Sequence, residues 1–202
     1  ATLRQRRHDF DEALNDLSHV LEIEPNHAQA WLTQAVIYQV QGNYQKARRS
    51  CLPLLRLSNV MVSTACIANV ASLNGQAEKS YQNLRTVVAQ DIFSPPQEKL
   101  WALTLLAEMA SRIGKDSEAE HHFQEGLSID PQDTYLLGAY SDFLLDRGRS
   151  TKVQALLKDR IRSDGLLLRL ALAEQQLNAP TFKQHVDILK ARFDENRLRG
   201  EA

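Results

Sequence analysis

The chain has 202 residues, with 24 Lys and Arg against 25 Asp and Glu, and a formal net charge of -1. This near balance argues against a nucleic-acid binder that depends on bulk positive charge. Two cysteines are too few for a disulfide framework or a four-cysteine zinc site, and eight Gly and six Pro are too few for an all-β sandwich. No apolar stretch reaches the roughly 20 residues of a membrane-spanning helix, so we expect no membrane insertion.

Apolar residues recur three and four positions apart along most of the chain, which predicts amphipathic helices. In chain order we expect helices over 9–23, 27–41, 44–57, 60–73, 77–90, 97–112, 116–128, 133–146, 150–163, 165–177 and 181–195. Pro53 falls inside the third of these. Since proline removes the hydrogen bond to the Arg49 carbonyl, we expect a kink there.

Glycines punctuate the helical pattern at intervals of 33, 39 and 34 residues, at Gly42, Gly75, Gly114 and Gly148. The longest interval contains Ser94-Pro95-Pro96, which indicates an inserted loop. A glycine just past a helix adopts a positive φ at little cost, so each unit is expected to be two antiparallel helices around that turn. A small residue five positions later, Ala47 or Ala119, allows the two helices to approach closely. Pro25 and Pro131 then end second helices, and Asn26 or Asp133 can cap the next.

This pattern resembles the tetratricopeptide repeat. The matching positions are Trp31, Tyr38, Gly42, Tyr44 and Ala47 in one unit, Phe10, Ala13, Leu17 and Pro25 before it, and Ala107, Gly114, Ala119, Phe123 and Pro131 after it. Asn59 stands where the family usually has Pro. The likeness covers roughly residues 8 to 163, and Ala173, Phe182 and Leu189 fit a divergent unit over 164–202 in which Pro180 replaces the turn Gly. The chain is also similar to uncharacterised repeat proteins of Gram-negative bacteria.

The resemblance implies an all-α, right-handed solenoid of antiparallel helix pairs, with about four and a half repeats in a single domain over residues 1–202. Both ends are interpreted as boundaries inside a longer helical protein. A signal peptide could therefore lie outside the sequence, and the compartment, cytoplasmic or periplasmic, stays open. End helices without a capping repeat could also produce a homodimer.

The first helices of such repeats line a concave face, which usually holds an extended or helical peptide. The expected groove residues are Gln29, Leu32, Val36, Gln39, Ala65, Asn69, Ser72, Trp101, Thr104, Glu108, Arg112, Tyr135, Asp142, Asp146, Leu170 and Glu174. Some family members clamp a C-terminal carboxylate there with Lys, Asn and Arg. Of the corresponding residues here, which are Leu32, Val36, Asn69, Trp101 and Leu105, only the Asn matches, so no such clamp is expected.

The expected groove runs from an apolar part near Val36 to acidic residues at Asp142, Asp146 and Glu174, which would suit a partner that is apolar and then basic. Alternatively, these carboxylates simply solvate an exposed helix face. Trp101 and Tyr135 are candidate binding hot spots. Trp101 could instead pack the loop at Pro95 and Pro96 against the repeats. Trp31 is assigned to the core.

Little in the sequence indicates catalysis or metal binding. His121 and His122 are adjacent, so on a helix their side chains diverge by about 100° and chelate poorly, and we expect them to be exposed. No glycine-rich phosphate loop, nucleophile elbow or calcium loop is present. We therefore expect no enzyme, no cofactor and no metal site.

Cys51 and Cys66 fall on neighbouring helices of consecutive repeats. A disulfide is possible if their Cα atoms lie within about 7 Å, and it would imply an oxidising compartment such as the periplasm. The alternative is two small buried thiols at helix interfaces.

The sequence thus predicts a non-catalytic scaffold or adaptor that binds a protein or peptide. One alternative is a regulatory or sensor module that holds a small ligand or a missing segment of its own chain. Another is an accessory domain of an enzyme. An enclosed pocket with converging polar groups would favour the ligand, and an open groove would favour the peptide.

Overall fold

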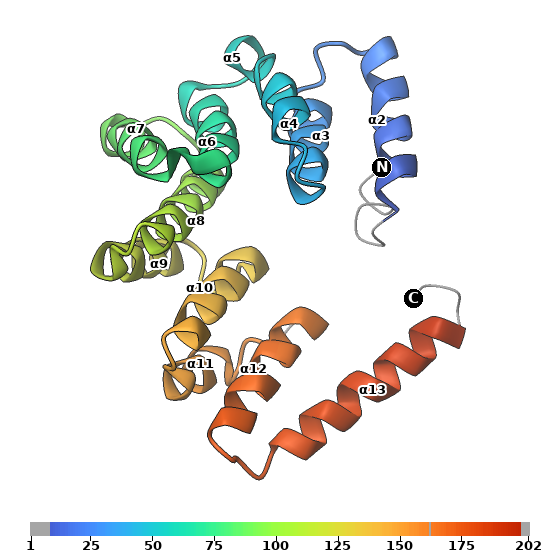
Figure 1. Cartoon of the computed structure of the whole chain (residues 1–202), viewed down its shortest axis with the longest axis vertical. Coiled ribbons are helices and arrows are strands. Elements are labelled where there is room, and N and C mark those ends of the chain that lie inside the picture. Colours follow the sequence, from blue (N-terminus) through green and yellow to red (C-terminus); the bar gives the residue numbers. More distant parts are fainter. Residues whose placement is uncertain (1–8, 162, 199–202) are drawn as a thin grey trace. The chain divides into compact units, whose positions relative to one another are not determined.

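The computed structural model describes residues 9–161 and 163–198, and this part of the chain is built from helices joined by short turns (Figure 1). The helices are α2 (Phe10–Ile23), α3 (Ala28–Val40), α4 (Tyr44–Cys51), α5 (Leu54–Leu57), α6 (Val60–Ala71), α7 (Ala77–Gln90), α8 (Pro96–Arg112), α9 (Asp116–Ile129), α10 (Thr134–Asp146), α11 (Ser150–Leu157), α12 (Asp164–Gln176) and α13 (Phe182–Leu198). The expected all-α fold of paired helices is confirmed.

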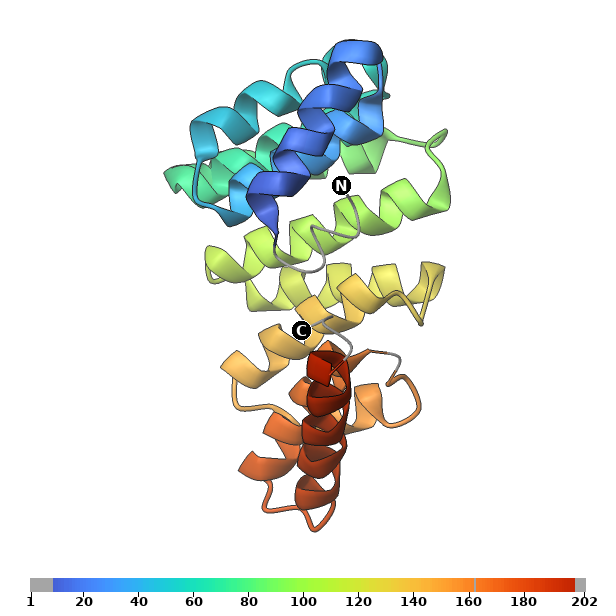
Figure 2. The same ribbon diagram turned by 90° about the vertical axis from the view of Figure 1, so that its right-hand side faces the viewer.

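The chain divides into two compact units, Ala1–Ala119 and Glu120–Ala202. The single domain expected over 1–202 stays a prediction. In the first unit α3, α4, α6 and α7 pack against one another in chain order (Figure 2). In the second unit α10, α11, α12 and α13 do the same.

The turn glycines adopt the backbone conformation that the repeat pattern requires. Gly42, Gly75, Gly114 and Gly148 have φ values of 73°, 84°, 75° and 64°. Ala47 and Ala119 are fully buried, as close helix packing requires. The turn between α12 and α13 uses Asn178 at φ 52° in place of glycine, so Asn178, and not Pro180, stands at the turn position.

Local signals account for most helix ends. Pro53 separates α4 from α5 at the expected kink, although Leu52 and Pro53 themselves keep helical backbone angles. Asp133 caps α10 by accepting a hydrogen bond from the Leu136 amide at 2.7 Å, as predicted. At α3 the cap is His27 and not Asn26, since the His27 Nδ1 accepts from the Ala30 amide. The helix expected over 150–163 ends earlier, at Leu157.

Each unit has a core of its own. In the first unit Cys51 and Cys66 form a disulfide with their Cα atoms 5.7 Å apart, in a cluster that includes Leu54 and Val70. Trp31 packs against this cluster and against the one around Leu17, as its assignment to the core requires. In the second unit Phe123 is fully buried, stacks on Tyr140 at 4.7 Å between ring centroids and lies 5.5 Å from the Phe143 ring.

Candidate peptide-binding groove

A pocket of about 430 Å³ lies in the first unit, where the first helices of three successive pairs meet. Gln29 and Leu32 reach it from α3, Val62 from α6 and Trp101 from α8, and Leu57 of α5 completes the wall. A volume of 300–1,000 Å³ is typical of small-ligand sites, so this pocket can hold one or two side chains of a partner.

The walls of the pocket are mainly apolar. Leu32, Leu57 and Val62 are partly exposed, and the fully buried Leu54 lies behind them. Trp101 is partly buried and packs against the core cluster that contains the Cys51–Cys66 bond. Because one side of the indole rests on a rigid core and part of the ring stays accessible, Trp101 is suited to contact an apolar side chain.

Asn59 organises a polar rim at one edge of the pocket. Its Oδ1 caps α6 by accepting from the Val62 amide at 2.9 Å, while its Nδ2 donates to the Ser94 hydroxyl at 3.3 Å and to the Glu98 carboxylate. The Asp91 carboxylate in turn accepts hydrogen bonds from the Ser94 amide and hydroxyl, at 3.0 and 2.9 Å. These hydrogen bonds hold the loop before α8 at the edge of the pocket.

That loop presents two large apolar side chains to solvent. Ile92 and Phe93 are 81% and 89% exposed, directly before Ser94 on the rim. Single exposed apolar residues are ordinary, but two in succession on a hydrogen-bonded loop beside an apolar pocket extend the surface available to a partner.

The first unit brings together some of the expected groove residues and not others. Gln29 and Trp101 line the pocket, with Leu32, while Val36, Gln39 and Glu108 are partly buried elsewhere along α3 and α8. Asn69 is 91% buried, and its Oδ1 has no hydrogen-bond partner among the described residues. Arg112 donates from Nη1 to the Ser72 hydroxyl at 2.8 Å, so it ties α8 to the turn after α6.

In the second unit one of the three expected acidic groove residues, Glu174, is buried, whereas Asp142 and Asp146 are exposed. Glu174 is only 2% exposed, accepts a hydrogen bond from the Thr181 hydroxyl at 2.6 Å and lies 2.7 Å from His185 Nδ1. Asp142 forms a two-point ion pair with Arg169, at 2.7 and 2.6 Å. A buried carboxylate needs such partners because desolvation of an unpaired charge is costly. Tyr135 and Asp146 are exposed.

Eight pocket residues had not been singled out as groove candidates: Ala28, Leu54, Leu57, Ser58, Asn59, Val62, Gln97 and Glu98. Two sequence signals point toward some of them. Pro53 marks the start of α5, which contributes Leu54 and Leu57 to the pocket, and Ser94-Pro95-Pro96 marks the loop that Asn59 holds.

The described histidines do not assemble a metal site. His121 is exposed as expected, but His122 is buried, so the expectation of two exposed side chains is wrong for the second. Among residues 9–161 and 163–198 no three His, Cys, Asp or Glu side chains are placed to hold a metal ion. The same part of the chain has no helix long and apolar enough to cross a membrane.

Known proteins share this architecture. Residues 6–56 match the tetratricopeptide repeat family. The crystal structure of PilW, described as a widely conserved type IV pilus biogenesis factor, has a TM-score of 0.63 at 17% identity, over 95% of this chain and 89% of that one. A Pseudomonas aeruginosa PilF structure has a TM-score of 0.56 at 16% identity, over 98% and 88%. A tetratricopeptide repeat protein from Parabacteroides merdae has a TM-score of 0.55 at 15% identity, over 99% and 86%.

No curated protein matches the sequence. At these identities the similar structures establish the fold and not the activity. The family match therefore places a tetratricopeptide repeat within residues 6–56, and the similar structures show that the rest of the chain shares the helix-pair fold of such repeat proteins.

Proposed function

We propose that this protein is a non-catalytic scaffold whose first unit binds a peptide segment of a protein partner in the Trp101 pocket. The observation that carries the proposal is the apolar slot formed by Leu32, Val62 and Trp101 at the junction of three first helices. Interface energy concentrates where an aromatic side chain is held rigidly and is covered on binding. The core cluster holds one side of Trp101, and a bound segment would cover its exposed part.

The polar rim supports a peptide over a small apolar molecule. Gln29 and Glu98 place an amide and a carboxylate group beside the slot, where main-chain N–H and C=O groups of a bound segment need partners. Ile92 and Phe93 offer further apolar contact outside the pocket, which a segment longer than one residue could use. We therefore expect the bound segment to insert one large apolar side chain and continue across the loop.

The tetratricopeptide fold is common among protein-interaction scaffolds, which supports the proposal. The chain shares this fold with PilW and PilF. The role of PilW in type IV pilus biogenesis is described for PilW and is not transferred to this chain. The proposal for this chain depends on its own pocket.

Two substitutions on α6 test the proposal. Val62→Glu places a charge inside the slot, whereas Val60→Glu places the same charge on the same helix at a side chain that is 68% exposed and outside the pocket. Both variants and the wild-type protein are used to capture partners from a native lysate, and a peptide from a captured protein is then titrated by calorimetry. We expect Val62→Glu to weaken binding at least tenfold, because a buried unpaired charge costs more than about 1.4 kcal/mol, and Val60→Glu to leave it unchanged.

Equal capture by all three proteins would place the binding surface elsewhere. Capture of no protein, together with calorimetric binding of a small metabolite that Val62→Glu abolishes, would replace the scaffold with a ligand sensor. Circular dichroism of both variants shows whether the fold is kept.

A further inference from the structure

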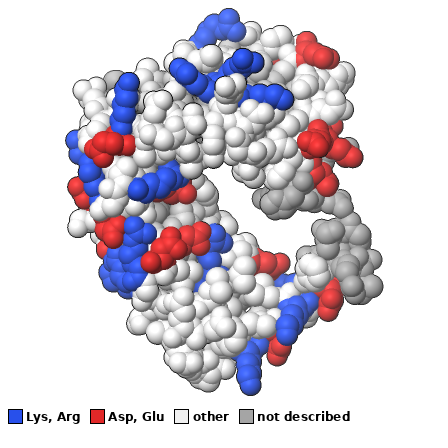
Figure 3. Space-filling view, viewed as in Figure 1, with Lys and Arg blue, Asp and Glu red and all other residues white. Residues whose placement is uncertain are grey.

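The part of the chain from α4 to α7 is strongly basic. Residues 44–90 contain six Lys and Arg and one acidic residue, Glu78, in a chain whose net charge is -1. Glu78 is already paired with Lys115, at 2.8 Å. In the space-filling view Lys and Arg side chains gather over α4 and α5 (Figure 3). This charge is distinct from the apolar pocket around Trp101.

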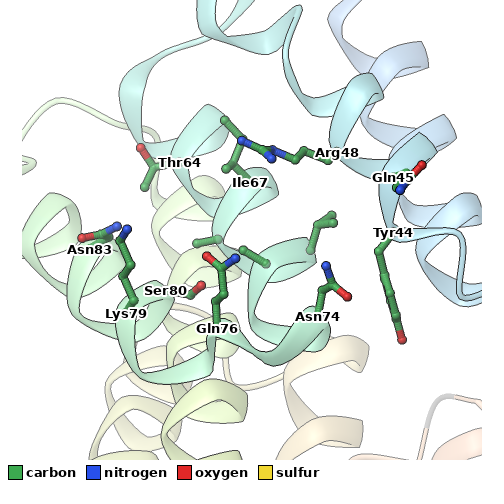
Figure 4. Close-up of a pocket in the computed structure, with 13 residues that line it drawn as sticks. Tyr44, Gln45, Arg48, Thr64, Ile67, Asn74, Gln76, Lys79, Ser80 and Asn83 are labelled. Atoms are coloured by element: carbon green, nitrogen blue, oxygen red, sulfur yellow. The ribbon is translucent and has the colours of Figure 1, made fainter.

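A second pocket, of about 500 Å³, opens within this basic part, between α4, α6 and α7. Arg48 reaches it from α4, and Gln76 and Lys79 reach it from the start of α7 (Figure 4). None of its lining residues is acidic, and none lines the Trp101 pocket. The two cations therefore flank one space from opposite helices, with the uncharged α6 behind it.

Neither cation has a carboxylate partner among the described residues. Other basic side chains form ion pairs with an acid, for example Arg149 with Glu120 at 2.6 Å and Arg169 with Asp142 at 2.6 Å. Two uncompensated cations beside a concave surface give a positive potential that attracts an anion. An anion bound there would gain charge-assisted hydrogen bonds without displacing an internal partner.

The other polar groups of the pocket decide between kinds of anion. Gln45, Asn74, Gln76 and Asn83 each contribute a side-chain amide, which has both donors and an acceptor. A phosphate group mainly accepts hydrogen bonds from such a lining, whereas a peptide main chain both donates and accepts along its length. The amides and the two cations together match a peptide that carries carboxylate side chains.

We propose that this pocket is a second binding site, which takes an acidic peptide segment of a partner protein. Arg48 and Lys79 bind its carboxylates, and the amide side chains bind its main chain. This site does not depend on the Trp101 pocket. A scaffold with both sites could hold two segments of one partner or two different partners.

The test uses the full chain, labelled with ¹⁵N, and the blocked peptide acetyl-Ala-Glu-Ala-Glu-Ala-amide. We expect saturable NMR shifts at the side-chain amides of Asn74, Gln76 and Asn83, with a Kd of about 1 mM or below. The peptide with Gln in place of Glu should bind at least about tenfold more weakly. Arg48→Glu should weaken binding of the acidic peptide by about tenfold or more. Arg49→Glu, which makes the same charge change one residue later on α4 and outside the pocket, should change it less than about threefold.

Three results would overturn the proposal. These are no saturable shift up to about 10 mM peptide, equal binding of the Gln peptide, or equal weakening by Arg48→Glu and Arg49→Glu. Inorganic phosphate is titrated in parallel. If it binds at these amides and the acidic peptide does not, the site is one for phosphate. The Val62→Glu variant should bind the acidic peptide normally, which keeps this test separate from that of the Trp101 pocket.

Discussion

The Sγ atoms of Cys51 and Cys66 are bonded, which joins the end of α4 in one helix pair to the middle of α6 in the next. Both residues are buried in the cluster against which Trp101 packs. The bond therefore ties α6, which contributes Val62 to the Trp101 pocket, to the helix that directly precedes α5 and its pocket residue Leu57. Disulfides of this kind persist in oxidising compartments.

Reduction of this bond should lower the free energy of unfolding by about 3 kcal/mol, because the bond closes a loop of 15 residues in the unfolded chain. Guanidinium denaturation with and without dithiothreitol measures the difference. The control is the double variant Cys51→Ala, Cys66→Ala, whose midpoint should not respond to the reductant. Two titratable thiols in the denatured, unreduced protein would show that the native protein contains the buried thiols of the alternative interpretation.

Asn178 provides a second prediction, because it is the one described non-glycine residue with a positive φ. Asn178→Gly should raise the free energy of unfolding by about 0.5–1 kcal/mol, since glycine adopts this conformation with less strain. The reciprocal change Gly148→Asn, at the equivalent turn of the preceding pair, should lower it by a similar amount. Thermal unfolding of both variants checks the pair. A destabilising Asn178→Gly would mean that the asparagine side chain contributes more to the turn than its backbone strain costs.

Features set by single residues and their chain neighbours were predictable from sequence. The glycine turns, the Asp133 cap and the break at Pro53 all depend on backbone preferences that one residue expresses. The groove on the first helices stays a prediction from the repeat, and two of its expected residues, Gln29 and Trp101, line the pocket.

The sequence could not show which polar side chains have partners on distant helices. Asp142 and Arg169 are 27 residues apart in the sequence. Glu174 is buried beside His185, which lies on the following helix, α13. An acidic residue on a helix looks the same in the sequence whether it is solvated or paired. Similarly, Asn59 was placed by its repeat position, but its bonds to Ser94 and Glu98 depend on the loop length before α8.

Glu120 gives a prediction about pH. Its pKa is lowered to about 2, first by the hydrogen bond from Lys152 at 2.7 Å and then by that from Arg149 at 2.6 Å. Because the folded pKa lies below the unfolded value near 4.5, the stabilisation is complete above about pH 5 and is lost as the pH falls toward 2. Glu120→Gln should therefore lower the free energy of unfolding at pH 7 by about 1 kcal/mol, a value discounted for the solvent exposure of Lys152.

Urea denaturation of wild type and Glu120→Gln between pH 2 and pH 7 measures this effect. The two unfolding curves should converge as the pH approaches 2. Glu118→Gln, at an exposed carboxylate two residues earlier on α9, is the matched control and should change stability little at any pH. A difference between wild type and Glu120→Gln that stays constant with pH would show that the ion pairs do not stabilise the fold.

The buried Glu174 makes the packing of α13 on α12 depend on one side chain. Glu174→Ala removes the acceptor for the Thr181 hydroxyl and the partner of His185, so two polar groups lose their contacts at the helix interface. We expect the substitution to lower the free energy of unfolding by about 1–3 kcal/mol. The effect should be concentrated in α13, because Thr181 directly precedes that helix and His185 lies in its first turn. Amide hydrogen exchange of α13 should accelerate by about 10- to 100-fold, while that of α6 and α7 stays unchanged. Glu195→Ala, at an exposed carboxylate on α13, should leave exchange at the wild-type rate. Uniform acceleration across both units would instead mean that Glu174 stabilises the whole chain and not the docking of its last described helix.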